Sequence, residues 1–416
     1  MVIELILIVD INHGALDVAR EYYNLGYRDI HIWDIYGKLE RDRSILKQYN
    51  DIIKYLKIIP SKGKIDFSKY QEVVAPVHCP INCRFNTFHN VISEILREKY
   101  GSIHRRFIEV TGVKGKTTTT ELLYYILSKE YNVFINNSNR GSITPVSVLK
   151  CIDKLYEKNT LDNYDLFLFE VSLGITTCKY GALINVLENY PIGGGLRDAL
   201  LGKMSTMRLA DRAYINRRVL QEYFKTGHSI EGDIVEVDSE NVEILSKYPL
   251  KYTYRGRVVE FNRGIFGTHY LENSLFAIEI CRNFLDIEDI LERIPSFKID
   301  GRMNLRSQNP VVVENINPGL DVKSIEYGLR DFKSIFRRGT VVIGGDFGCT
   351  CEEIDTGKLG EVLREYRDYF KYILVGPLGK ELRRYIEGEY LESLEDVYQR
   401  EILEDTLILY RRAISP

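Results

Sequence analysis

The chain has 416 residues, a length that predicts two to four domains, each able to bury a core of its own. Its formal net charge of -3 argues against a broad basic surface, so nucleic acid is not an expected partner. No apolar run is long enough to span a bilayer, and seven cysteines without an export signal predict reduced thiols in the cytoplasm.

Residues 1–104 alternate strand and helix patterns, which predicts a parallel sheet with right-handed crossovers. The predicted strands are 5–9, 30–33 and 72–77, and the predicted helices are 14–25 and 44–59. Asp10, His13 and Asp34 follow strand ends, at the edge where open α/β sheets bind ligands. The first turn lacks the glycine fingerprint of dinucleotide sites, so this region is either a substrate-binding domain or a purely structural Rossmann-like unit.

Two histidines and two cysteines lie close together in the sequence after the third strand, at His78, Cys79, Cys83 and His89. They raise the hypothesis of a zinc site. Their irregular spacing and the lack of a second cysteine pair favour reduced loop cysteines instead.

A glycine-rich loop stands between a β-branched apolar run, residues 107–110, and a segment with helical periodicity. Its pattern is Gly112-x-x-Gly115-Lys116-Thr117, two residues shorter than the general phosphate loop. Glycines let backbone N–H groups curl around an anion, and the helix N-terminus adds partial positive charge. Lys116 can reach the terminal phosphates and Thr117 can offer its hydroxyl to Mg²⁺. The alternative is a plain strand-to-helix turn, but the context predicts nucleoside triphosphate binding.

Further polar residues follow predicted strands and helices downstream. Glu170 ends the apolar strand 165–172 and is either a magnesium ligand or a solvated acid. A strand is predicted at 182–187, and Lys203 follows in a helical stretch. His269 and Asn273 share one face of a helix that runs to about residue 284, where such a pair is often only a cap. The last region is again β/α, with strands at 311–314, 341–344 and 372–375 and helices at 323–332 and 360–369.

Together these segments resemble the Mur ligase family of ATP-dependent, ADP-forming carboxylate ligases. Residues 111–118 (TGVKGKTT) resemble its phosphate loop, and residues 169–172 (FEVS) resemble the strand end whose Glu binds magnesium. Lys203 resembles the lysine that members carbamylate to bridge a second metal. The other matching segments are 267–273 (GTHYLEN), 301–302 (GR) and 317–318 (NP).

The resemblance implies an α/β fold with three domains. These are a Rossmann-like domain at 1–104, a P-loop ATPase domain with a mainly parallel sheet at 105–301, and a Rossmann-like domain at 302–416. It also implies ATP and Mg²⁺ as cofactors and a small-molecule carboxylate as substrate. The implied catalytic residues are Lys116, Glu170, Lys203 and His269, and the implied metal ligands are Thr117, Glu170 and Lys203. The implied nucleotide-binding residues are Thr111, Gly112, Lys114, Gly115, Lys116, Thr117, Thr118, Asn273, Arg302 and Asn317.

The chain also departs from the family pattern. Tyr190 and Ile316 stand where members have histidines, and Tyr270 replaces an asparagine. The glycine fingerprint that binds UDP is missing from the first domain. These departures weaken the case for a UDP-sugar substrate and for the usual second-metal geometry.

Within the family, four segments resemble an archaeal branch that acts on a nickel tetrapyrrole: 10–14 (DINHG), 75–78 (APVH), 169–174 (FEVSLG) and 190–197 (YPIGGGLR). The resemblance implies that a propionate is activated as an acyl phosphate and that a ring carbon attacks it, which closes a carbocycle. It implies Asp10, His13, His78 and Arg197 as substrate-binding residues. The alternative branch is the pseudomurein peptide ligases, which form an amide bond on a cell-wall precursor. Alternatives of another class are a P-loop NTPase switch and a non-catalytic nucleotide-binding protein.

Overall fold

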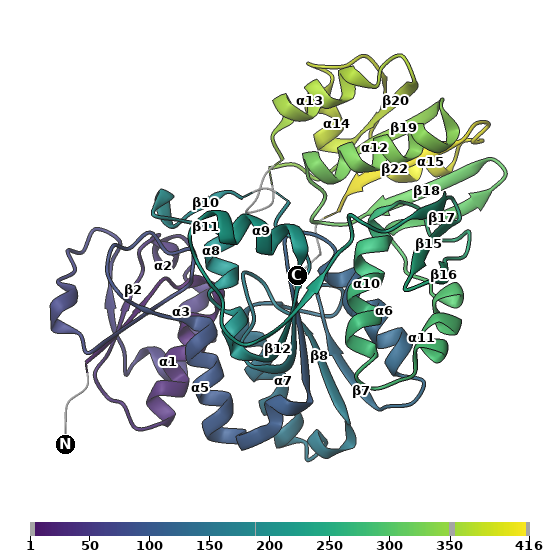
Figure 1. Cartoon of the computed structure of the whole chain (residues 1–416). Coiled ribbons are helices and arrows are strands. Elements are labelled where there is room, and N and C mark those ends of the chain that lie inside the picture. The colour runs from purple at the N-terminus through teal and green to yellow at the C-terminus, as the bar shows by residue number, and fades with distance from the viewer. Residues whose placement is uncertain (1–4, 188, 349–353, 413–416) are drawn as a thin grey trace. The chain divides into compact units, whose positions relative to one another are not determined.

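The structure, a computed structural model, describes residues 5–187, 189–348 and 354–412 and divides into two compact units. The first unit comprises residues 1–239 and 273–285, and the second comprises 240–272 and 286–416. Each of the three predicted domain ranges contains one of the larger sheets (Figure 1). The domain boundaries themselves stay a prediction.

The first unit opens with a five-stranded parallel sheet in the order β3-β2-β1-β4-β5. Its strands are β1 (Ile6–Val9), β2 (Ile30–Trp33), β3 (Lys57–Ile59), β4 (Glu72–Ala75) and β5 (Asn86–Thr87). Its helices are η1 (Asn12–Gly14), α1 (Ala15–Asn24), α2 (Lys38–Arg41), α3 (Ser44–Gln48), α4 (Asn50–Ile53) and α5 (Phe88–Tyr100). The strand order reverses between β1 and β4, which makes their carboxyl ends a switch point of the kind that binds ligands.

A second parallel sheet in the same unit has the order β13-β12-β9-β6-β8-β7. Its strands are β6 (Phe107–Thr111), β7 (Val133–Asn136), β8 (Leu166–Glu170), β9 (Cys178–Leu183), β12 (Ala210–Asn216) and β13 (Asp233–Val237). The connecting helices are α6 (Lys116–Leu127), α7 (Pro145–Glu157), α8 (Ala199–Met204) and α9 (Arg217–Lys225). A short hairpin is formed by β10 (Pro191–Ile192) and β11 (Arg197–Asp198). One apolar cluster runs from the first sheet through α5 and α7 to this one, so the two sheets share a core.

The second unit contains a six-stranded sheet in the order β17-β18-β22-β19-β20-β21, parallel except for the β17–β18 hairpin. Its strands are β17 (Arg302–Gln308), β18 (Val311–Ile316), β19 (Gly339–Gly345), β20 (Phe370–Val375), β21 (Glu389–Leu391) and β22 (Thr406–Arg411). Strands β14 (Ile244–Lys247), β15 (Leu250–Tyr254) and β16 (Arg257–Glu260) form a small antiparallel sheet. The helices are α10 (His269–Cys281), which continues into the first unit, α11 (Ile287–Arg293), α12 (Val322–Phe336), α13 (Thr356–Glu365), α14 (Gly376–Leu382) and α15 (Leu394–Tyr398).

Several predicted elements were wrong in extent. The predicted helix 44–59 ends at Ile53, and Lys57–Ile59 is instead the edge strand β3, paired with His31–Trp33. Its apolar residues suit a helix or a strand, and pairing with β2 decides the outcome. The strand predicted at 182–187 is β9, which ends at Leu183, and the helix predicted at 360–369 is α13, which ends at Glu365.

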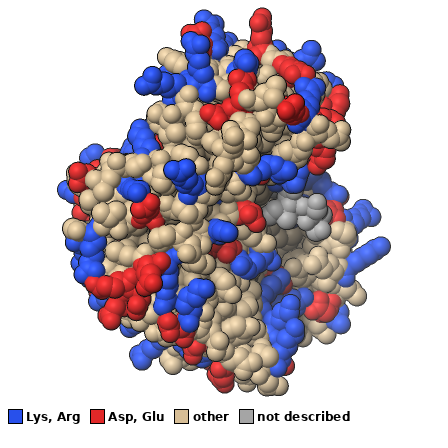
Figure 2. Space-filling view, turned by 90° about the vertical axis from the view of Figure 1, so that its right-hand side faces the viewer, with Lys and Arg blue, Asp and Glu red and all other residues tan. Residues whose placement is uncertain are grey.

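Acidic and basic side chains are mixed on the surface. Figure 2 shows Lys and Arg interspersed with Asp and Glu over the face in view. Among the described residues, none of the helices is at once long and apolar enough to cross a membrane.

Candidate active site

The glycine loop joins the fully buried strand β6 to helix α6, as predicted. Gly112 and Gly115 have φ values of 150° and 81°, and a Cβ on Gly115 would lie 2.2 Å from Oδ1 of Asn273. Asn185, which lies just beyond the neighbouring strand β9, fixes the loop between the glycines. Its Oδ1 accepts the Lys114 N–H at 3.0 Å, and its backbone oxygen accepts the Val113 N–H at 3.0 Å. The loop therefore has a defined shape and room only for glycine at position 115.

A buried carboxylate and a hydroxyl meet beside this loop. Glu170, 2% exposed at the end of β8, accepts the Thr117 hydroxyl at 2.9 Å and the Ser138 N–H at 3.0 Å through the same oxygen, Oε2. The ammonium of Lys116 lies 3.8 Å from Oε1 of Glu170. Two oxygens bound side by side to one octahedral Mg²⁺, each at about 2.1 Å, are separated by about 3.0 Å. The Thr117–Glu170 pair fits that geometry.

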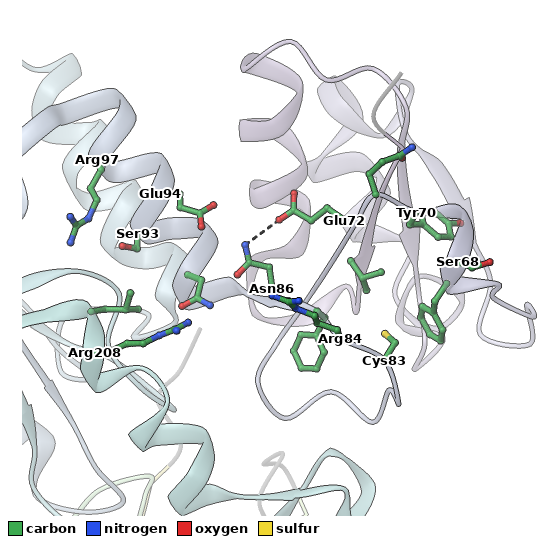
Figure 3. A pocket seen from close by; sticks show the side chains of 16 residues that line it. Ser68, Tyr70, Glu72, Cys83, Arg84, Asn86, Ser93, Glu94, Arg97 and Arg208 are labelled. Carbon is green, nitrogen blue, oxygen red and sulfur yellow. Dashed lines mark hydrogen bonds between the residues drawn. The ribbon is translucent and has the colours of Figure 1, made fainter. Parts of the chain in front are cut away.

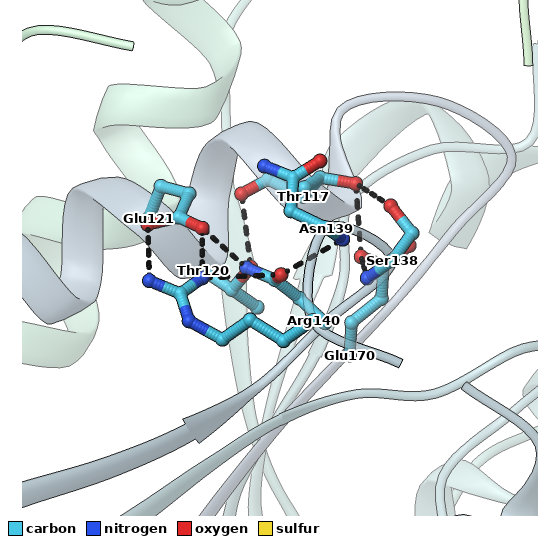
Figure 4. A network of polar contacts seen from close by, with 8 residues as sticks. Thr117, Thr120, Glu121, Ser138, Asn139, Arg140 and Glu170 are labelled. Atoms are coloured by element: carbon cyan, nitrogen blue, oxygen red, sulfur yellow. Dashed lines mark hydrogen bonds and ion pairs between the residues drawn. The ribbon is translucent and has the colours of Figure 1, made fainter. Parts of the chain in front are cut away.

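The loop after β7 brings Ser138 into this group, and a polar network holds the loop against α6 (Figure 4). Arg140 forms an ion pair with Glu121, which lies on α6. Asn137 donates to Oε1 of Glu121 at 2.8 Å and to the Thr120 hydroxyl at 3.1 Å. These contacts keep Ser138 2.8 Å from the Thr117 hydroxyl.

Lys203 is 2% exposed on α8, and its charge acts on the buried His89 of α5. The His89 Nε2–H donates to the backbone oxygen of Ser172 at 2.9 Å, two residues beyond Glu170. The pKa of His89 is lowered to about 4, mainly by burial; the hydrogen bond to Ser172 opposes this shift, and the charges of Lys203 and His78 add to it. His89 is thus bound close to the strand end that carries Glu170 and senses the charge of Lys203. Carbamylation of Lys203 stays a prediction.

The four residues predicted to bind substrate lie together in the first unit. Asp10 and His13 follow β1, His78 follows β4, and Arg197 begins β11. The His13 and His78 rings meet edge to face with centroids 4.6 Å apart. Burial lowers the pKa of His78 to about 4, helped by the charges of His13 and Arg197 against that of Asp10. Arg197 donates to the backbone oxygen of Cys79 and lies over the Phe85 ring at 4.7 Å.

The cysteines of this segment are free of disulfide bonds. Cys79 and Cys83 are free thiols, and burial raises the pKa of Cys79 to about 12. Neither joins the one group of potential metal ligands found among the described residues, which is Asp10, His13 and His78. The reduced state expected of these thiols stays a prediction.

The remaining predicted residues divide between the units. Thr111 and Thr118 are buried beside the phosphate loop, and Asn273, on α10, accepts the Thr119 hydroxyl at 3.4 Å. The second unit contains the predicted residues His269, Arg302 and Asn317. There the buried Tyr270, one of the departures from the family pattern, donates to the backbone oxygen of Arg302.

Sequence reasoning missed a cavity of about 1010 Å³ in the first unit, between α5 and the first sheet (Figure 3). Its charged lining comprises Glu72, Arg84, Glu94, Arg97 and Arg208. None of the residues predicted for the site lines it. Sequence reasoning also missed the contacts that Asn185, Ser138 and His89 make around the phosphate loop and the end of β8. The sequence did contain a signal for Asn185 and Ser138, because each is a polar residue shortly after a strand, β9 and β7 respectively.

Comparison with known proteins matches residues 305–413 to the family model described as "Coenzyme F430 synthetase CfbE, C-terminal domain". Over 412 residues, 98% of this chain and 99% of the relative, the sequence is 45% identical to a coenzyme F(430) synthetase of Methanocaldococcus jannaschii.

Solved structures share the fold at low identity. A pseudomurein peptide ligase type C from Methanothermus fervidus has a TM-score of 0.53 at 12% identity, covering 98% of this chain and 96% of that one. A MurF ligase from Thermotoga maritima in complex with ADP has a TM-score of 0.54 at 16% identity, covering 83% and 85%. These likenesses confirm the predicted α/β fold class.

Proposed function

The chain belongs to the coenzyme F430 synthetase family of ATP-dependent ligases, and we propose that it cyclises a nickel seco-tetrapyrrole acid. ATP would phosphorylate a propionate of the macrocycle, with release of ADP. A ring carbon would then close the carbocycle. The proposal is supported by the full-length relative and by the intact phosphate loop facing a buried carboxylate.

The first step places a substrate carboxylate oxygen on the γ-phosphorus, and the bond between that phosphorus and ADP breaks. Such a transfer depends on positioning and on neutralising charge. The backbone N–H groups of the glycine loop would hold the phosphates, and Lys116 would contact the terminal ones. Thr117 and Glu170 would hold Mg²⁺, which supplies charge neutralisation on the phosphate oxygens when it is bound.

The second step breaks the bond between the acyl carbon and the phosphate oxygen. A ring carbon that has lost a proton attacks the acyl carbon, a C–C bond forms, and inorganic phosphate leaves with the electron pair. Lys203, near the same strand end, would stabilise the negative charge of the acyl phosphate region, as a carbamate ligand to a second metal or as an ammonium.

The test is release of ADP by the full chain with a nickel seco-tetrapyrrole acid, compared with a UDP-linked cell-wall precursor. We expect ADP release with the tetrapyrrole acid and none with the UDP-linked precursor. In Lys116→Ala, turnover should fall at least a hundredfold. The matched control is Lys129→Ala, an exposed lysine just after the same helix, which should keep full turnover. Release only with the UDP-linked precursor would favour a peptide ligase. Release without any acceptor would favour a switch, and retained turnover in Lys116→Ala would contradict the phosphate-loop assignment. The cytoplasmic location expected from the cysteines stays a prediction.

A further inference from the structure

The proposed ring closure needs a base, because the attacking ring carbon has to lose a proton before the new bond forms. Lys116, Thr117 and Glu170 are assigned to the phosphates and Mg²⁺ in the first step, so none of them serves as that base. Histidine is the side chain that most often takes up such a proton. His13 lies in the turn that follows β1, and its surroundings suit this task.

Asp10 orients the His13 ring from inside the fold. The Asp10 carboxylate is 1% exposed, and its Oδ1 accepts both the backbone and the side-chain N–H groups of Asn12, at 2.8 and 2.9 Å. Its Oδ2 lies 3.3 Å from Nδ1 of His13. A carboxylate that accepts the Nδ1–H leaves the lone pair on Nε2, the nitrogen on the far side of the ring. In hydrolases with a catalytic triad, a buried aspartate holds the catalytic imidazole in this way and stabilises its protonated form.

The backbone of this turn is held in a strained conformation. Asp10 and His13 have φ values of 78° and 60°, in the left-handed region that disfavours residues with a Cβ. Strain of this kind gathers at active sites and ligand clamps, where the surrounding structure maintains it. The fold therefore keeps the Asp10–His13 pair in place against a backbone cost.

His13 is the accessible member of a pair of histidines. Its side chain is 37% exposed, and the ring of His78 contacts it edge to face with the centroids 4.6 Å apart. Nδ1 of His78, in contrast, is buried. Burial lowers the pKa of His78 to about 4, helped by the charges of His13 and Arg197 and opposed by that of Asp10. His78 is therefore neutral at pH 7 and does not repel the positive charge that His13 gains with a proton. A substrate reaches His13 from its exposed side, not from between the rings.

The turn after β1 lies next to the elements that surround Glu170. A Cβ added to Gly14, in this turn, would lie 2.7 Å from Val146 at the start of α7. Just before α7, the backbone oxygen of Ile143 accepts the Ser172 N–H at 2.8 Å, and Ser172 follows Glu170 by two residues. The start of α7 therefore stands between the turn and the end of β8.

The second histidine leads to the same strand end by another route. The charge of His78 acts on the buried His89, and His89 donates to the backbone oxygen of Ser172 at 2.9 Å. Both routes end at the residues that follow Glu170, where the proposed acyl phosphate would form. The His13–His78 pair thus borders the proposed site of ring closure.

We propose that His13 is the base of the ring closure and that Asp10 is its positioning residue. This deepens the proposed function and rests on it. Nε2 of His13 takes the proton from the attacking ring carbon, whose C–H bond breaks and leaves its electron pair on the carbon. That carbon attacks the acyl carbon, the C–C bond forms, and inorganic phosphate leaves with the electron pair of the broken C–O bond. The imidazolium, stabilised by the Asp10 carboxylate, then releases its proton to water.

Hydroxylamine separates the two steps of the reaction, because it attacks an acyl phosphate and gives a hydroxamate. The full chain is incubated with ATP, Mg²⁺ and the nickel seco-tetrapyrrole acid, with and without hydroxylamine, and ADP, closed product and hydroxamate are measured. In His13→Asn we expect ring closure to fall at least a hundredfold, which is the usual contribution of a base. ADP release with hydroxylamine should stay within about threefold of the wild type, with hydroxamate in place of closed product.

The variants are chosen to preserve the turn. Asparagine tolerates the left-handed φ of position 13, so His13→Asn removes the imidazole without adding strain. Asp10→Asn should lower ring closure at least tenfold and leave hydroxamate formation unchanged, because an amide cannot stabilise the imidazolium. His228→Asn, at an exposed histidine of the same unit, is the matched control and should close the ring like the wild type.

A second variant tests the chemistry of the imidazole itself. Glycine also suits the φ of 60° at position 13, and His13→Gly removes the whole ring. Imidazole added to the buffer should raise ring closure by this variant at least tenfold and leave the wild-type rate unchanged. A residue with a merely structural role would show no such rescue.

The outcomes separate this inference from the proposed function. Wild-type ring closure in His13→Asn would overturn the assignment of the base. A parallel loss of ring closure and hydroxamate would also overturn it, since His13 would then act before the second step, and so would a His13→Gly variant that imidazole does not rescue. In each of these cases ADP release and ring closure by the wild type would leave the proposed function standing. A wild-type chain that releases no ADP with the tetrapyrrole acid, with or without hydroxylamine, would refute the proposed function instead.

Discussion

At the scale of single residues, Glu170 has the most constrained position in the candidate site. It is buried, and one of its oxygens accepts two hydrogen bonds, from Thr117 and Ser138. The Lys116 ammonium lies 3.8 Å from its other oxygen. A buried carboxylate without such partners would be costly, so the surrounding residues are arranged for its charged form. A bound Mg²⁺ would take over part of this compensation.

Replacing Glu170 with glutamine should therefore affect the metal more than the fold. Glutamine can still accept the hydrogen bonds from Thr117 and Ser138, but it has no charge for Mg²⁺. We expect the Mg²⁺ concentration for half-maximal ADP release to rise at least tenfold and turnover to fall at least a hundredfold. Glu157→Gln, the same change on an exposed position of α7, should leave both values as they are. An unchanged magnesium dependence in Glu170→Gln would exclude Glu170 as a metal ligand.

At the scale of elements, the sequence alone predicted those helices and strands whose pattern lies within a short stretch of chain. The β6–loop–α6 unit, the carboxylate at the end of β8 and three strands of the third sheet, β18, β19 and β20, follow from periodicity and glycine placement. The contacts of Asn185 and Asn273 with the loop did not follow, because they depend on which strand lies next to β6 and on a helix more than 150 residues away. The edge strand β3 was missed for the same reason, since its conformation is decided by pairing with β2.

The contact between Gly115 and Asn273 gives a prediction with a built-in control. Gly115 and Gly227 have nearly equal φ values, 81° and 80°. A Cβ added to Gly115 would lie 2.2 Å from Oδ1 of Asn273, whereas a Cβ added to Gly227 would have no neighbour within 4 Å. Alanine should cost about 1 kcal/mol of stability at either position from backbone strain alone. Only Gly115→Ala should also weaken ATP binding, by at least tenfold, measured by titration calorimetry. Equal affinities in the two variants would mean that the loop tolerates displacement of Asn273.

At the scale of the whole molecule, one buried acid, Glu109, is expected to make the stability of the first unit depend on pH. Glu109 lies in β6, in the interior of the six-stranded sheet, and is fully buried. Its oxygens accept from the backbone N–H and the hydroxyl of Thr176, both at 2.5 Å. Burial nevertheless dominates and raises the pKa of Glu109 to about 7, against the opposing effect of these hydrogen bonds. The chain's one tryptophan, Trp33, lies in the same unit and reports its unfolding.

Stability of the first unit should therefore fall as pH rises between about 4.5 and 7. Because the folded state holds this proton more tightly than the unfolded state, it binds more protons in that window, and the free energy of unfolding decreases with pH. The contribution is complete below the unfolded pKa and lost above the folded one, and a shift of this size corresponds to about 3 kcal/mol.

Urea unfolding followed by Trp33 fluorescence at a series of pH values measures this change in the free energy of unfolding. Glu109→Gln should flatten the slope of that free energy against pH, because glutamine does not titrate. Glu157→Gln should keep the wild-type slope. Identical slopes for Glu109→Gln and the wild type would show that Glu109 stays ionised throughout and that its hydrogen bonds, not its burial, decide its charge.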